Sequence, residues 1–323
     1  MTDGKFQFTE TGGPEKLTWI EGEAPTPGAG EVTIRQKAIG VNYIDIYHLT
    51  GTYPLPLPSG IGMEGAGVIE AVGEGVTGFA PGDRVAYVGG PPNAYSTVRT
   101  VPAGRVVNVP DDISFEIAAE MTFKGVTAEY LIRRCYAVKP TDTVLVLAAA
   151  GGVGSIMIQW LKSIGATVIG VTSSDEKAAQ VTALGADHVI LSGPSMLDDL
   201  KAVAPDGVDV VYDSVGKDTF EFSLEALKMR GTFVSFGVAS GPLPEDGLGK
   251  IGARPGIFFT KPSIVHYTTK REELEAGAAA VYDAISKGIV AAGSAVTYPL
   301  AKAPEALGDL QARKTKGSLL LIP

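Results

Sequence analysis

The sequence predicts an α/β protein of two domains, one rich in β-strands and one built on a doubly wound parallel sheet. The chain has 323 residues, more than the usual ~100–200 residues of one domain. Short segments separated by glycine and proline clusters fill the first third, with no strong helical pattern before about residue 114. From residue 143 onward, Val/Ile-rich segments alternate with amphipathic helical segments, which is typical of a parallel sheet.

In the first third, residues 31–41 alternate with a period close to two and predict a half-buried strand. Further strands are expected at 65–72, 84–88 and 106–109. Two separate helical stretches, 115–121 and 125–134, are expected to connect this domain to the next. The first domain is therefore predicted to be mainly β.

In the rest of the chain, strands are expected at 144–147, 167–171, 188–190, 208–212 and 232–236, with helices beginning near 154, 174, 196 and 218. After residue 262, helices at 271–287 and 304–313 and a strand at 318–322 are expected to return to the first domain. The predicted domains are thus residues 1–122 with 263–323, and 123–262.

Net charge, apolar stretches and cysteine content argue against several classes of protein. A net charge of −9 argues against a nucleic-acid partner. The most apolar stretch, residues 144–158, is too short and too interrupted by glycine to span a membrane, and residues 1–10 lack the apolar region of a secretory signal. We therefore expect a cytoplasmic protein. The single cysteine, Cys135, has no neighbouring base and predicts neither a disulfide nor a nucleophile.

A dinucleotide-binding turn is predicted at residues 145–154, Leu-Val-Leu-Ala-Ala-Ala-Gly-Gly-Val-Gly. Gly151 and Gly154 occupy the second and third glycine positions of the fingerprint, and Ala149 stands at the first. Gly151 lets the backbone approach a pyrophosphate, and Gly154 lets the following helix pack closely on the strand. The helix amides, including those of Gly152 and Val153, would face the anion.

The end of the next strand indicates which cofactor binds. There an NAD enzyme places an acidic residue on the ribose 2′-hydroxyl, whereas this chain has Gly-Val-Thr-Ser-Ser-Asp-Glu-Lys at 170–177. The hydroxyls of Ser173 and Ser174 and the ammonium of Lys177 favour the 2′-phosphate of NADPH. Asp175 is either an acid in the first turn of a helix, which the helix dipole favours, or a ribose ligand.

Longer motifs carry a resemblance to a known superfamily. Residues 62–67, Gly-Met-Glu-Gly-Ala-Gly, and 72–85 resemble the signature of the medium-chain dehydrogenases/reductases. Residues 41–47, 51–53, 124–128, 211–216, 235–237, 260–263 and 317–323 resemble the zinc-free quinone oxidoreductases and their ζ-crystallin relatives, so the similarity spans nearly the whole chain. It implies a GroES-like catalytic domain, a Rossmann domain and the cofactor NADPH.

The resemblance also implies site residues. An acceptor cleft would be lined by Asn42, Asp45, Tyr47 and Tyr53. The cofactor contacts would be Lys124, Thr127, Gly151, Gly152, Val153, Gly154, Ser173, Lys177, Ser214, Phe236, Gly237 and Arg313. Ser192 departs from the family, in which a tyrosine lies beside the adenosine phosphate. From the residues alone, Asn42 to Tyr47 could equally be a polar turn in which Asp45 caps a short helix, and Tyr53 a loop anchor.

No metal site is predicted, because one cysteine and the scattered His48, His188 and His266 cannot build a structural zinc site. Met63 stands where zinc alcohol dehydrogenases carry histidine. The predicted function is metal-free reduction of a quinone by hydride or electron transfer from NADPH. Two alternatives stay open, an NADPH-dependent enone or enal reductase and a non-catalytic, crystallin-like NADPH-binding protein. A homodimer is expected, paired through the apolar run at 256–260.

Overall fold

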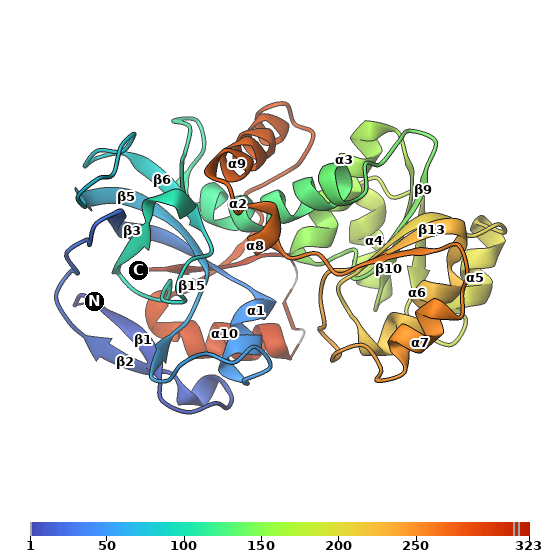
Figure 1. The fold of residues 1–323 in the computed structure, drawn as a ribbon, viewed down its shortest axis with the longest axis horizontal. Helices are drawn as coiled ribbons and strands as arrows, with labels where there is room; N and C mark the ends of the chain where they lie inside the picture. The colour runs from blue at the N-terminus through green and yellow to red at the C-terminus, as the bar shows by residue number, and fades with distance from the viewer. Residues whose placement is uncertain (1, 313, 316) are drawn as a thin grey trace. The chain divides into compact units, whose positions relative to one another are not determined.

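The computed structural model describes residues 2–312, 314, 315 and 317–323, and the chain forms two compact units (Figure 1). The first unit contains residues 1–126, 268–283 and 292–323. The second unit contains residues 127–267 and 284–291.

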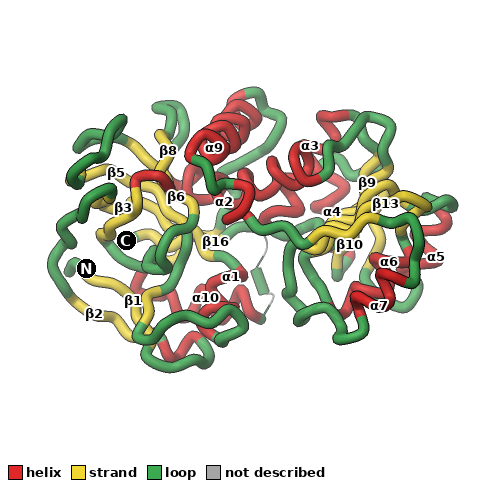
Figure 2. Tube along the Cα trace, viewed as in Figure 1, coloured by secondary structure: helices red, strands yellow, loops and turns green. Residues whose placement is uncertain are grey.

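The first unit is dominated by β-sheets, as the sequence predicts (Figure 2). Its seven-stranded sheet has the order β15-β16-β3-β5-β6-β8, with β7 paired to β3, and a small sheet has the order β2-β1-β4. The strands of the large sheet are β3 (Glu31–Val41), β5 (Glu64–Val72), β6 (Arg84–Val88), β7 (Val98–Pro102), β8 (Val106–Asn108), β15 (Val296–Pro299) and β16 (Leu319–Ile322). The small sheet has β1 (Gly4–Phe8), β2 (Thr18–Glu21) and β4 (Ser59–Gly60).

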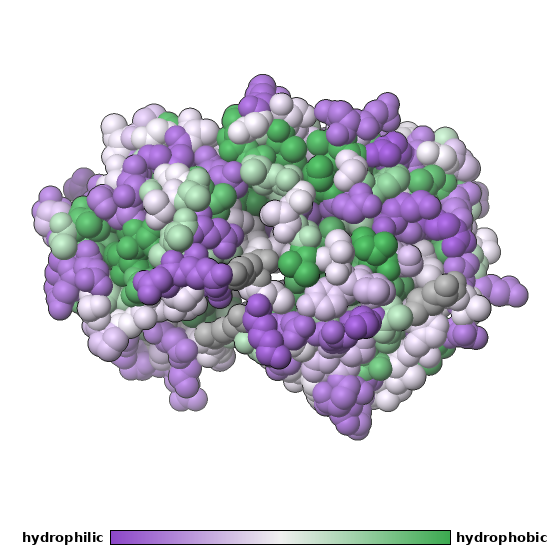
Figure 3. Space-filling model, turned by 180° about the vertical axis from the view of Figure 1, so that it is seen from behind, coloured by the Kyte–Doolittle hydropathy of each residue, from purple (hydrophilic) through white to green (hydrophobic). Residues whose placement is uncertain are grey.

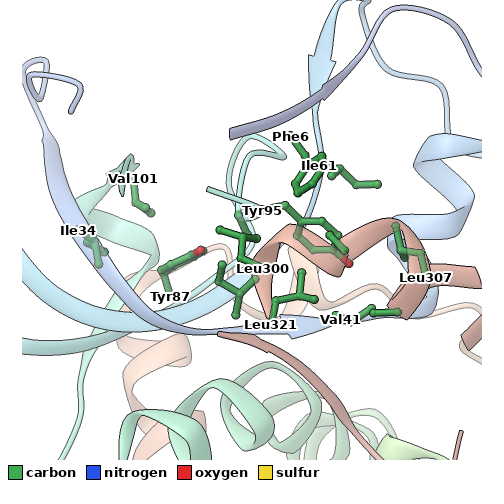
Figure 4. Packing of buried hydrophobic residues seen from close by; sticks show 14 of the residues in the cluster. Phe6, Ile34, Val41, Ile61, Tyr87, Tyr95, Val101, Leu300, Leu307 and Leu321 are labelled. Carbon is green, nitrogen blue, oxygen red and sulfur yellow. The ribbon is translucent and has the colours of Figure 1, made fainter. Parts of the chain in front are cut away.

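The core of the first unit lies between its sheets and the C-terminal segment of the chain (Figure 4). Tyr95 packs among Phe6, Ile61 and Leu300 there, and Tyr87 lies near Leu321. The predicted two-residue period of β3 breaks, since its pairing with β5 shifts register between Gln36 and Ala38. Residues on both sides of this strand are therefore buried.

The α-helices of the first unit are α1 (Tyr43–Leu49), α2 (Phe115–Tyr130), α9 (Arg271–Ser286) and α10 (Ala303–Gln311), of which α2 and α9 end in the second unit. The prediction of two helices at 115–121 and 125–134 was wrong, because α2 is continuous and then widens into a π-helical turn at Leu131–Cys135. Gly125 does not break it. A Cβ at Gly125 would lie 2.6 Å from Val281 Cγ1 on α9, so this glycine permits the close packing of two helices.

The second unit is a six-stranded parallel sheet in the order β11-β10-β9-β12-β13-β14, which confirms the predicted doubly wound sheet. Its strands are β9 (Thr143–Val146), β10 (Thr167–Thr172), β11 (His188–Leu191), β12 (Val208–Asp213), β13 (Leu227–Ser235) and β14 (Phe258–Thr260). Its helices are α3 (Gly152–Ile164), α4 (Asp175–Ala183), α5 (Met196–Val203), α6 (Phe220–Glu225), α7 (Gly247–Gly252) and α8 (Ile264–Tyr267).

Helices lie on both sides of this sheet, with α3 on one side and α6 and α7 on the other (Figure 1). The strand order runs outward in both directions from β9 and β12, which places a topological switch point between these two strands. Ligands of such sheets bind outside the carboxyl ends of the strands at this point. Within the part of the chain that the structure describes, no helix is both long enough and apolar enough to cross a membrane.

Candidate cofactor and acceptor sites

The turn between β9 and α3 is tight and depends on small residues. Gly151 caps α3, and Ala148 has a positive φ of 51°. A Cβ added at Gly154 would lie 2.5 Å from the carbonyl oxygen of Ala148, and one at Gly151 would lie 3.1 Å from the same atom. The amides at the start of α3 have no acceptor within the helix, so the turn forms an anion cradle that a side chain would fill.

The alanine at the first fingerprint position is accommodated by a glycine on the next strand. Ala149 is fully buried, and its amide donates to Val171 O at 3.0 Å. A Cβ at Gly170 on β10 would lie 3.0 Å from the Cβ of Ala149 and 2.7 Å from Val181 Cγ1. The fingerprint usually has a glycine where this chain has Ala149. Here the side chain of Ala149 fits because the residue next to it on the neighbouring strand, Gly170, has none.

At the end of β10, the predicted phosphate-binding residues are open to solvent. Ser173 and Ser174 are exposed, and Lys177 is half-buried. Ser174 caps α4, its Oγ accepting from the amide of Lys177 at 3.4 Å. Asp175 is exposed at the first position of that helix, where an acid interacts favourably with the helix dipole. The side chains of Ser173 and Lys177 therefore both reach the surface at the carboxyl end of β10.

A buried aspartate that the sequence reading missed organises the loop after β12. Asp213 Oδ1 accepts from the amides of Val215 (2.7 Å) and Gly216 (3.0 Å). Its Oδ2 accepts from the hydroxyls of Thr219 (2.8 Å) and Ser223 (2.9 Å). Burial raises the pKa of Asp213, and these four hydrogen bonds oppose that shift.

The same loop brings together the predicted residues of β12 and β13. The amide of Phe236 donates to Asp213 O at 2.8 Å, and a Cβ at Gly237 would lie 2.6 Å from Ser214 O. Ser214, Phe236 and Gly237 therefore lie side by side at the carboxyl end of the sheet. The signal in the sequence was an aspartate at a strand end followed by hydroxyl residues six and ten positions later.

The predicted cofactor residues of the second unit thus share one edge of one sheet. The segments at 151–154, 173–177, 214 and 236–237 follow β9, β10, β12 and β13 at their carboxyl ends. Ser192 joins this edge, since its amide donates to Thr172 O at 2.7 Å. Thr127 is buried in the second unit and Lys124 is buried in the first unit, whereas Arg313 lies outside the described residues.

The predicted acceptor residues lie at the start of α1, on it and just after it, in the first unit. Asn42 precedes the helix, and its amide nitrogen Nδ2 donates to Glu64 Oε1 at 2.8 Å. Asp45 is fully buried, and its Oδ2 accepts from the backbone amide of Asn42 and from the hydroxyl of Tyr95, both at 2.9 Å. The structure therefore places Asp45 as an anchor for the first turn of α1 rather than as a surface group.

A set of three tyrosines forms an aromatic ladder beside α1. The rings of Tyr43 and Tyr47 are 5.5 Å apart and those of Tyr47 and Tyr53 are 5.1 Å apart, both edge to face. The amide of Tyr53 donates to Tyr47 O at 3.0 Å, which fixes the loop to the helix. Tyr53 keeps 37% of its surface exposed. Tyr43 was not among the predicted residues, although its spacing of four from Tyr47 on a helix is a readable signal.

The ion pair of Lys124 and Glu64 lies in the first unit, next to Asn42. Lys124 Nζ is 2.6 Å from Glu64 Oε1, and both side chains are buried. Glu64 was not predicted as a site residue. Among the described residues, no group of three or more His, Cys, Asp and Glu side chains is arranged to hold a metal ion.

Two family models match the chain. Residues 28–133 match the alcohol dehydrogenase GroES-like domain, and residues 152–292 match the zinc-binding dehydrogenase model. Together with the cradle at the switch point, they define the class as a dehydrogenase with a GroES-like domain and a Rossmann-type domain.

Full-length relatives narrow the class. The chain is 42% identical over 322 residues to a quinone oxidoreductase of Pseudomonas aeruginosa, covering 99% of both proteins. It is 41% identical to a 2-haloacrylate reductase of a Burkholderia species, covering 97% of this chain and 96% of that protein. The solved structure of Escherichia coli quinone oxidoreductase complexed with NADPH superposes with a TM-score of 0.96 at 40% identity, covering 99% of this chain and 100% of that one. The chain belongs to the quinone oxidoreductase family of the medium-chain dehydrogenases/reductases, as its motifs predict.

Proposed function

We propose that this protein is an NADPH-dependent quinone reductase that works without a metal ion. The observation that carries the proposal is the match along the full chain, at 41–43% identity, to curated quinone oxidoreductases of three bacteria. A structural neighbour that contains NADPH, at a TM-score of 0.96, supports the choice of cofactor.

The chain's own residues fit NADPH. The turn at Gly151 and Gly154 has no side chain between a pyrophosphate and the amides at the start of α3, and Ser173 and Lys177 suit a 2′-phosphate. Bound NADPH supplies the hydride or electrons. The loops that Asp213 holds at Ser214 and at Phe236–Gly237 would border the remainder of the cofactor.

On the acceptor side, we assign Asn42, Tyr47 and Tyr53 to orienting the quinone and Asp45 to fixing the start of α1, the helix that Asn42 precedes and Tyr53 follows. A quinone is already electrophilic, and its reduced oxygen can take a proton from water. Neither a Lewis acid nor a dedicated general acid is then required. The composition agrees with this chemistry, since one cysteine and three histidines offer few zinc ligands.

Chelation and a tyrosine variant test the mechanism. We expect enzyme treated with a chelator to keep its rate of quinone-dependent NADPH oxidation. We expect Tyr53→Phe to lose much less than the ~10²–10⁴-fold that removal of a general acid costs. Loss of activity on chelation, or a loss of that size in Tyr53→Phe, would contradict the proposed mechanism.

A second candidate function is reduction of an activated C=C bond. It is favoured by the 41% identity to the 2-haloacrylate reductase. Saturating a C=C bond requires a proton on carbon, so a tyrosine or a water relay matters more for this reaction than for quinones. Rates with quinones, enones and haloacrylates, measured on the wild type and on Tyr53→Phe, separate the two. A rate with any alkene far above that with every quinone would favour the second candidate.

Cofactor preference gives another expected result. Lys177→Ala should raise the Michaelis constant for NADPH about tenfold and leave that for NADH nearly unchanged, because only NADPH has the 2′-phosphate that the ammonium would contact. Lys201→Ala, which removes an exposed cation from α5 of the same unit, is the matched control. Steady-state kinetics with both cofactors measure the effect, and equal changes for NADPH and NADH would remove Lys177 from the phosphate site.

We also propose that the protein is a homodimer, paired through β14 at the edge of the parallel sheet. Phe258 on β14 is 63% exposed, and an apolar edge strand favours pairing with a second copy. On the face shown in Figure 3, hydrophobic residues gather in separate patches between hydrophilic ones. We further propose that the protein is cytoplasmic, as predicted from the sequence.

Light scattering at micromolar concentration checks the dimer. We expect a dimer for the wild type and a monomer for Phe258→Glu, because a buried charge without a partner would disfavour the pairing. Val296→Glu introduces the same charge on β15 of the first unit, where Val296 is 45% exposed, and should stay dimeric. A monomeric wild type would overturn the proposal.

A further inference from the structure

One buried carboxylate connects two of the predicted site residues. Glu64 begins β5 and is 1% exposed. Its Oε1 accepts from Lys124 Nζ at 2.6 Å and from Asn42 Nδ2 at 2.8 Å, and its Oε2 accepts from the amide of Phe123 at 3.2 Å. All of these groups belong to the first unit.

The fold reserves space for this carboxylate. Gly40 on β3 lies directly opposite Glu64 in the antiparallel pair. A Cβ at Gly40 would lie 2.0 Å from Glu64 Oε1 and 2.3 Å from its Cδ. The glycine therefore lets the side chain turn toward both Asn42 and Lys124.

We propose that Glu64 is a positioning residue that fixes the amide of Asn42 and the ammonium of Lys124 with a single carboxylate. The inference rests on the proposed function, in which Asn42 orients the acceptor and Lys124 contacts the cofactor. Glu64 ties the start of α1 to the middle of α2, because it binds one residue at each. It thereby fixes the position of the acceptor residue, Asn42, relative to that of the cofactor residue, Lys124.

No smaller or neutral side chain can replace the carboxylate. The three groups that surround it are all donors, an ammonium, a side-chain amide and a backbone amide. In Glu64→Gln, either orientation of the new amide points an NH₂ group at one or more of these donors. A buried donor is then left without an acceptor, and the side chain of Lys124 loses its counter-charge.

The test is a set of double-mutant cycles with two readouts. NADPH affinity is measured by fluorescence titration without an acceptor, and the acceptor Michaelis constant is measured with a quinone. Glu64→Gln should weaken both about tenfold, since a hydrogen bond to a charged group is worth roughly that factor or more. Lys124→Met should then add less than about threefold to the loss of NADPH affinity in the Glu64→Gln background. In the same Glu64→Gln background, Asn42→Ala should add less than about threefold to the rise in the acceptor Michaelis constant.

Two further variants separate positioning from general damage. Gly40→Ala keeps the charge of Glu64 but displaces it, and should reproduce both losses. Glu120→Gln on the same helix as Lys124 keeps an oxygen for the amide of Gly293, which Glu120 binds at 2.7 Å, and should leave both readouts within about twofold.

Additive losses in both cycles, or unchanged affinities in Glu64→Gln, would overturn the inference. If the wild type binds NADPH but reduces no quinone, only the proposed function is contradicted. The double-mutant cycle of Glu64 and Lys124, measured by NADPH binding, would still decide the role of Glu64. If the wild type does not bind NADPH, both the proposed function and the proposed role of Glu64 are contradicted.

Discussion

Gly154→Ala is expected to weaken NADPH binding roughly 100-fold. The added Cβ would lie 2.5 Å from Ala148 O and 2.9 Å from both Ala149 Cα and Ala149 O, all of them backbone atoms of the cradle. Backbone atoms cannot move aside as the end of a flexible side chain can, so the turn itself must shift. A shift would misplace several amide donors at once, and each lost hydrogen bond to a charged phosphate costs about 1.5–3 kcal/mol.

Fluorescence titration with NADPH measures this loss, and circular dichroism checks that the variant is folded. Gly249→Ala is the matched control, because a Cβ at Gly249 in α7 of the same unit meets no atom within 4 Å. Gly151→Ala should fall between the two, since its Cβ would lie 3.1 Å from the nearest atom. A folded Gly154→Ala protein with the affinity of the wild type would show that the turn does not hold the cofactor.

The sequence predicted the second unit well because its signals are local. Most strands of the parallel sheet are or end in a short apolar run, and each predicted cofactor segment directly follows one of them. The carboxyl ends of parallel strands meet at one edge, so a residue's place after a strand already indicates the edge where it lies. The strand order itself, with β12 next to β9, comes from packing between distant segments and was not predicted.

The residues that the sequence reading missed depend on partners far along the chain. Gly170 makes room for Ala149, 21 positions earlier, and Gly40 makes room for Glu64, 24 positions later. Neither glycine lies in a recognisable motif. The same reason explains the error at α2, where two helices were predicted at 115–121 and 125–134, whereas Gly125 within the one continuous helix accommodates Val281 of α9.

The site residues of α1 show where a motif alone is ambiguous. From the residues, Asn42 to Tyr47 fitted either a polar turn or an acceptor cleft. The structure shows that these roles are compatible, since Asp45 binds the amide of Asn42 at the start of α1 while Asn42 Nδ2 reaches Glu64. The burial of Asp45 depends on Tyr95, 50 positions away, and no local pattern could reveal it.

Asp45 is expected to make the first unit less stable as pH rises from about 4 to about 7. Burial raises the pKa of Asp45 from 3.8 to about 7 in the folded protein, against the opposing hydrogen bonds from Asn42 and Tyr95. The folded state therefore binds this proton more tightly than the unfolded state does across that range. Since the unfolded state binds fewer protons there, the free energy of unfolding falls by about 1.4 kcal/mol per pH unit from this group.

Asp45→Asn isolates this effect. The oxygen of the new amide can accept from both Asn42 and Tyr95, as Oδ2 does now, and its NH₂ group takes the place of Oδ1, which has no hydrogen-bond partner among the residues that the structure describes. That NH₂ group changes stability by an amount that does not depend on pH. The difference in unfolding free energy between Asp45→Asn and the wild type should therefore move by about 3 kcal/mol in favour of the variant between pH 4 and pH 7, and level off by about pH 8.

Tryptophan fluorescence can follow the first unit alone. The chain has two tryptophans, Trp19 in the first unit and Trp160 in the second, so a Trp160→Phe background leaves only Trp19. Urea unfolding of this protein with and without Asp45→Asn, at intervals from pH 4 to pH 8, gives the difference directly, because every other titrating group is common to both. A difference that is constant with pH would mean that Asp45 stays ionised in the folded protein, and that Lys124 and the two hydrogen bonds outweigh its burial.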